Sequence, residues 1–189
     1  MSEQDEQLQV EQLMALFNHV FSSRYRTLLV RGEDEPLYSP ARDEHDYHRV
    51  IFAHGYFASA LHEISHWCIA GAQRRLLEDY GYWYLPDGRD DNAQQAFEAA
   101  EVAPQAIEKQ MTLSCARRFN VSVDNLDGSA EVDRDAFAAL VEARRQRYLS
   151  EGWPLRAAAF YQALSALFQE GVPLEKACLL YTSPSPRDS

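Results

Sequence analysis

The segment H-E-I-S-H, at residues 62–66, combines residue types and a spacing that can bind a metal ion. His62 and His66 are four residues apart, which on a helix places them one above the other, roughly 6 Å apart. Both imidazoles can therefore reach one ion. Glu63 is turned by about 100° around the helix from His62, so it can face a metal-bound water or a neighbouring ligand.

The residues around this motif predict a buried helix. Its uncharged members are Ala60, Leu61, Ile64, Trp67, Cys68 and Ile69. Two histidines and a glutamate inside such a helix are costly unless other groups satisfy them. The alternative is an exposed helix that carries the five letters by chance, and the apolar frame argues against it. Cys68 lies about 200° around the helix from His66, so we expect it in the core and away from the metal.

A catalytic metal site needs a third protein ligand as well as open positions. The strongest candidates are Glu98 and Glu101, in F-E-A-A-E-V-A-P-Q-A-I-E, and a solvated charge is the alternative for either. We prefer Glu101, because Gln105 follows four residues later on the same helix face and can hold an imidazole in place. Glu98 remains the alternative ligand. Weaker candidates are Asp79, Asp87 and Glu108.

Three further residues are candidates for substrate binding. His54 precedes Gly55 at the entry to the motif helix and can line the site, although a structural role is commoner at such a position. Asp87 and Arg89 belong to the turn P-D-G-R-D-D and can reach a cationic substrate. Ordinary turn chemistry is the alternative for both.

Length, charge and cysteine content restrict the class of protein. The 189 residues suffice for one domain with a sizeable core. The formal net charge of −11 disfavours direct binding to nucleic acid and suits a cationic partner. The polar start M-S-E-Q-D-E-Q predicts no signal peptide, and no apolar run approaches the ~20 residues of a membrane span. An odd set of 3 cysteines favours a reducing cytoplasm over a disulfide framework.

The hydrophobic pattern predicts an α+β fold, predominantly helical, with a small β-sheet beside the motif helix. The motif helix is expected to run to about residue 79. Other predicted helices cover 7–21, 92–100, 105–117, 133–148 and 155–169, and predicted strands cover 26–31 and 48–53. The segment 32–40 is predicted to be a loop, and Pro104 to start or kink a helix. In the helix that Asp133 caps, Phe137, Leu140 and Val141 are expected to face inward.

We expect residues 1–177 to form a single catalytic domain. Residues 178–189 include C-L-L-Y-T-S-P-S-P-R-D, which resembles the conceptual translation of a sequencing adapter. A disordered Ser/Pro tail is the alternative, and both interpretations exclude this stretch from the fold prediction.

Four longer motifs resemble the bacterial elongation factor P hydroxylase family. They are H-R-V-I-F-A-H-G-Y-F-A-S-A-L-H-E-I-S-H-W-C-I-A-G, G-Y-W-Y-x-P-D-G-R-D, F-E-x-x-E-V-x-P-Q-A and F-N-V-S-x-D-N-L-x-G, in that order. The resemblance implies a cytoplasmic, metal-dependent enzyme with a non-haem-type site. It also implies that the substrate is elongation factor P, hydroxylated on its modified lysine after a β-lysyl group has been attached.

The family implies an oxygenase, whereas H-E-x-x-H followed by a glutamate is the spacing of a metallopeptidase. In a hydroxylase, His62, His66 and Glu101 would hold Fe(II), and Glu63 would orient a ligand or relay protons. In a zinc metallopeptidase, Glu63 would be the general base. A metal-stabilised binding module without turnover is a third, weaker alternative. We favour the hydroxylase, with elongation factor P as its partner and with no direct contact to nucleic acid or membrane.

Overall fold

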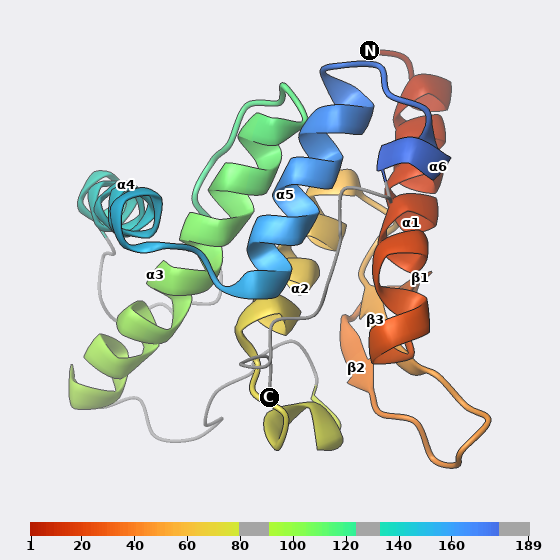
Figure 1. Ribbon diagram of the computed structural model, residues 1–189. Helices are drawn as coiled ribbons and strands as arrows, with labels where there is room; N and C mark the ends of the chain where they lie inside the picture. The colour runs from red at the N-terminus through yellow and green to blue at the C-terminus, as the bar shows by residue number, and fades with distance from the viewer. Residues whose placement is uncertain (80–90, 124–132, 178–189) are drawn as a thin grey trace.

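The computed structural model describes residues 1–79, 91–123 and 133–177, with only the backbone described for 91–99 (Figure 1). These residues form the predicted α+β fold, which is mostly helical. The helices are α1 (Glu3–Tyr25), α2 (Phe57–Ile69), α3 (Asp91–Ser114), α4 (Arg134–Glu151), α5 (Leu155–Phe168) and α6 (Leu174–Ala177), with a short 3-10 helix at Arg74–Leu76. The strands are β1 (Thr27–Arg31), β2 (Leu37–Ser39) and β3 (His48–Phe52). In the described ranges no helix is both long and apolar enough to cross a membrane.

Helix α2, which carries the H-E-x-x-H motif, is the central element. It contacts α3, α5, α1 and strand β3, and Figure 1 shows it behind α5 with α3 and α1 to either side. Most of its side chains are consequently buried, including Leu61, Ile64 and Trp67. This confirms the prediction of a buried helix and excludes an exposed one.

The sheet has the order β1-β3-β2, with β1 parallel to β3 and β2 antiparallel to it. The two predicted strands are confirmed as β1 and β3. The prediction of a loop over 32–40 is wrong in part, because β2 lies within it. Three residues give no periodic signal, and it is pairing with β3 and the bridge between Tyr38 and Asp79 that make this segment a strand.

Helix α2 ends at Ile69, and the prediction that it continues to about residue 79 is wrong. The last carbonyl groups of the helix accept hydrogen bonds from arginines instead of from a further turn. Arg156 on α5 donates to the carbonyls of Trp67 and Ala70 at 2.6 and 2.7 Å, and Arg75 donates to Ala70 at 2.7 Å. These donors satisfy the groups that a helix end leaves without partners.

Helices α3 and α4 lie close to the ranges predicted for them. The segments predicted around Pro104 form one continuous helix with the proline inside it. Asp133 caps α4, as predicted, by accepting a hydrogen bond from the backbone N–H of Ala136. Phe137 and Val141 are buried, but Leu140 is 50% exposed, so its predicted inward orientation is wrong.

Candidate metal centre

Helices α2 and α3 pack together and bring three potential ligands into one group. His62 and His66 come from α2 and Glu101 from α3, and each offers a ligand atom within 4.8 Å of the other two. Nε2 of His66 lies 3.2 Å from Oε1 of Glu101, and the two imidazole centroids are 4.8 Å apart. Atoms this close can converge on one ion, because metal–ligand bonds of about 2 Å leave them roughly 3 Å from each other.

The group is buried. Among these three, His66 and Glu101 are 2% and 3% exposed, and the side chain of His62 is 17% exposed. Polar groups buried at this depth need hydrogen bonds, opposite charges or a metal ion. The alternative of a solvated charge is therefore wrong for Glu101.

The carboxylates around the group of three favour positive charge there. Burial works against a charged ring at His62, but the carboxylates of Glu108, Glu63 and Glu101 outweigh it and raise its pKa to about 10. Burial also opposes the negative charge on Glu101. The pKa of that carboxyl is nevertheless held below its usual value by the hydrogen bond and positive charge of His66, with smaller contributions from His62 and Gln105. Both shifts favour an ionised carboxylate beside a cation.

Gln105 lies next to Glu101, but its partner differs from the prediction. Its hydrogen bonds go to a carboxylate and a backbone and not to an imidazole. Nε2 donates to the carbonyl of Ser122 at 2.8 Å and lies 3.4 Å from Oε2 of Glu101, while Oε1 accepts from the N–H of Ser122 at 3.0 Å. Gln105 therefore fixes the segment around Ser122 against α3 and supports the carboxylate of Glu101.

Glu108 is a second buried acid on the same face of α3, two turns after Glu101. Its Oε1 and Oε2 lie 3.4 and 3.5 Å from Nδ1 of His62. From sequence Glu108 is a weak ligand candidate, and in the structure it lies outside the group of three. The seven-residue spacing from Glu101, two helical turns, was the signal that it would share this face.

Glu63 and Cys68 are both buried on α2, and the predicted role of Glu63 stays a prediction. Glu63 is 6% exposed and close enough to His62 to contribute to its raised pKa. Cys68 is buried in the core, as predicted, and burial raises its pKa to about 12, so it is an unreactive thiol.

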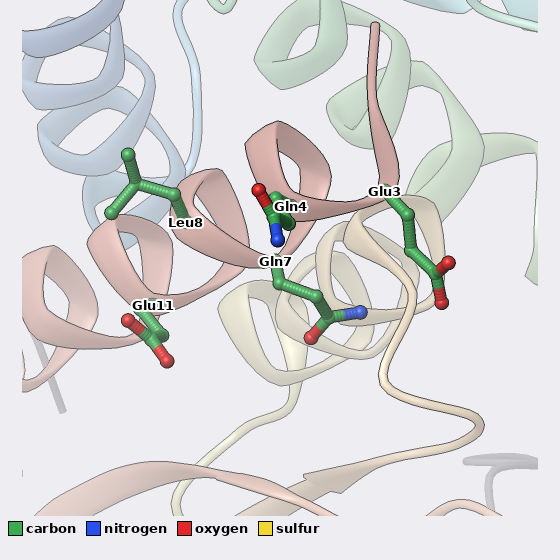
Figure 2. Close-up of a pocket in the computed structure, with 5 residues that line it drawn as sticks. All are labelled: Glu3, Gln4, Gln7, Leu8 and Glu11. Carbon is green, nitrogen blue, oxygen red and sulfur yellow. The ribbon is translucent and has the colours of Figure 1, made fainter.

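Of the remaining candidates that the structure describes, His54 and Asp79 lie outside the group of three. His54, at the β3–α2 turn, is half exposed; its Nδ1 lies 3.9 Å from Oδ1 of Asp34, and its ring is tilted against that of Tyr56. Asp79 pairs with Arg74. Asp87, Arg89 and the side chain of Glu98 lie outside the described residues, so their assignments stay predictions. Figure 2 shows an open hollow lined by Glu3, Gln4, Gln7, Leu8 and Glu11 of α1, and none of the candidate ligands lines it.

Comparison with known proteins identifies a family and a relative that this chain resembles. A family model described as "Elongation factor P hydroxylase" matches residues 16–178. A protein of Haemophilus influenzae named "Elongation factor P lysine hydroxylase" is 45% identical over 159 residues, which cover 84% of this chain and 89% of that protein.

Proposed function

This chain belongs to the elongation factor P hydroxylase family, and we propose that it hydroxylates a lysine of elongation factor P at a metal ion held by His62, His66 and Glu101. The relative's name supports the protein substrate and the reaction. The observation that supports the metal is the close approach of three ligand atoms in a buried group surrounded by carboxylates.

The donor set fits a metal ion. Two imidazoles and one carboxylate are the ligands of non-haem Fe(II) oxygenases, and they leave positions open for other molecules. The same three groups also suit zinc. When bound, Fe(II) would supply the activation of O₂ that insertion of an oxygen atom into a C–H bond requires.

The side chains of the chain itself do the positioning. His62 and His66, fixed one turn apart on α2, present their rings to one point, and Glu101 approaches that point from α3. Gln105 keeps the Glu101 carboxylate in place through its contacts with Ser122. Glu63, buried beside His62, is placed to hold or relay a proton at its carboxylate.

The carboxylates beside the proposed metal site support a cationic substrate. A lysine that carries a β-lysyl group bears ammonium groups, and we propose this modified form as the substrate. The net charge of −11 favours its approach, and the potential that raises the pKa of His62 to about 10 would also attract an ammonium group.

The test is activity after reconstitution of metal-free protein under anaerobic conditions. Fe(II) is expected to restore the gain of one oxygen atom on modified elongation factor P, measured by mass spectrometry. Glu63→Gln should keep the metal and lose turnover. Zinc-dependent peptide cleavage with no oxygen gained would contradict the proposal and indicate a metallopeptidase.

A further inference from the structure

We propose that Glu108 is a positioning residue for His62, an inference that rests on the proposed metal site. Its carboxylate accepts a hydrogen bond from the Nδ1–H of His62, and this directs Nε2 of the same ring toward the ion. The ring would then bind the metal through one nitrogen while the other is fixed by α3.

The geometry places both oxygens of Glu108 on one nitrogen. They lie 3.4 and 3.5 Å from Nδ1 of His62, a few tenths of an ångström beyond a usual N–H···O bond of about 2.7–3.2 Å. Such bonds are often long before the metal or substrate is bound and shorten afterwards.

The burial of Glu108 supports this role. The residue is 7% exposed, and a buried carboxylate is costly without a partner. Among the described residues, His62 is the group that its carboxylate is paired with. Thr112 bonds to the backbone carbonyl of Glu108 and not to its side chain. The contact with His62 is therefore what makes an acid tolerable at this position of α3.

A direct ligand role for Glu108 fits the geometry less well. Glu101 and Glu108 are two turns apart, about 10 Å along the helix axis. Glu101 approaches the His66 end of the pair, and Glu108 approaches the His62 end from the Nδ1 side. A nitrogen that donates its proton to Glu108 has no lone pair for an ion, so Nε2 must be the metal-binding atom.

Helix α3 thus supports the site at two levels. Gln105 holds the Glu101 ligand, and Glu108 holds the His62 ligand. Partners of this kind set the tautomer and direction of an imidazole, and their loss typically lowers metal affinity by about 10- to 100-fold.

The experiment measures the affinity of the purified chain for Zn²⁺ in competition with a chelator. Glu108→Ala is expected to bind Zn²⁺ about 10- to 100-fold more weakly than the natural sequence. Glu108→Gln should lose less, because an amide oxygen still accepts the Nδ1–H. Glu6→Gln is the control: it removes a partly buried ion pair with Arg117 and should leave Zn²⁺ affinity unchanged.

A second measurement keeps the test valid if Glu108→Ala does not fold. In the Zn²⁺-loaded chain, the Nδ1–H proton of His62 is expected to give a slowly exchanging NMR signal. In Glu108→Gln the signal should persist but move upfield, because a neutral acceptor replaces a charged one.

Three results would overturn the proposal. One is a folded Glu108→Ala variant with unchanged Zn²⁺ affinity. Another is an unmoved His62 signal in Glu108→Gln. The third is loss of binding in Glu108→Gln as complete as in His62→Ala, which would make Glu108 a ligand. If the natural chain bound no Zn²⁺ at all, the proposed metal site itself would be wrong.

Discussion

The two sides of helix α2 are both buried, yet they are stabilised in different ways. On one side Trp67 packs edge-to-face against Phe17 and Phe21 of α1, with ring centroids 5.2 and 4.8 Å apart. On the other side His62 and His66 face the carboxylates of α3. The first side consists of apolar contacts, and the second consists of polar groups that satisfy one another.

This difference determines what each side can do. Apolar contacts contribute to stability roughly in proportion to buried area, and each can be lost without stranding a charge. On the polar side, removal of one partner leaves another buried and charged. We infer that the Trp67 side stabilises the helix, while the histidine side retains its costly groups because they bind an ion.

The largest expected effect comes from removing the carboxylate ligand. Glu101→Ala should weaken metal binding by more than about 100-fold and abolish hydroxylation, since it deletes a ligand and not merely a support. The measurement is metal affinity together with oxygen gain on elongation factor P. Glu98→Ala is the matched variant on the same helix and should retain both. The reverse result would transfer the ligand role to Glu98.

The apolar side is broken by Trp67→Ala. We expect a loss of about 3–5 kcal/mol in the free energy of unfolding, because a fully buried indole is replaced by a cavity. Urea unfolding followed by circular dichroism measures this. The folded fraction should bind metal as the natural chain does. If metal affinity instead fell as far as in Glu101→Ala, the two sides would not be separable.

The end of α2 is expected to give a smaller effect. Arg156→Met removes the donor to the carbonyls of Trp67 and Ala70 and should cost about 1–3 kcal/mol of unfolding free energy. Arg156→Lys should recover only part of this, since one ammonium does not reproduce the planar fork. Arg147→Met, which breaks an exposed pair with Glu151, should change stability by less than about 0.5 kcal/mol.

The smallest effect concerns an ion pair at the surface, between α3 and α4. Hydrogen bonds from Arg145 lower the pKa of Glu142 to about 2. Slight burial opposes this shift, and hydrogen bonds from Lys109 and Gln146 add to it. Because the folded pKa lies below the ordinary value, the stabilisation is present above about pH 4.5 and is lost as the pH falls toward 2.

Glu142→Gln tests this contribution. The variant should be less stable than the natural chain by under about 1 kcal/mol at pH 7, because the side chain is 35% exposed and screened by solvent. The difference should shrink as the pH falls through about 2 and vanish below it. A difference that persists there would indicate a packing effect and not a charge effect.

Local patterns predict most of the fold, and they point to the three residues whose ligand atoms the structure brings close together. Apolar residues around His62 and His66 indicated a buried helix, and Asp133 marked the start of α4. The preference for Glu101 is consistent with its burial beside His66, because spacing along α3 fixes which side chains share a face.

What the sequence did not reveal depends on partners distant in the chain. Helix α2 ends early because Arg156, 89 residues after Trp67, bonds to its final carbonyls. Gln105 forms its hydrogen bonds with Ser122, which lies in a segment without regular secondary structure. Hydrophobic periodicity does not predict the position of such a segment. The contact of Glu108 with His62 depends on how α3 packs against α2, and spacing along one helix does not predict this packing.

The most direct test of the central claim is anomalous diffraction from crystals of the chain loaded with Fe(II) under anaerobic conditions. We predict one ion, bound by His62, His66 and Glu101 from the two facing helices. An ion bound elsewhere, or an anomalous peak without Glu101 among its ligands, would contradict the account.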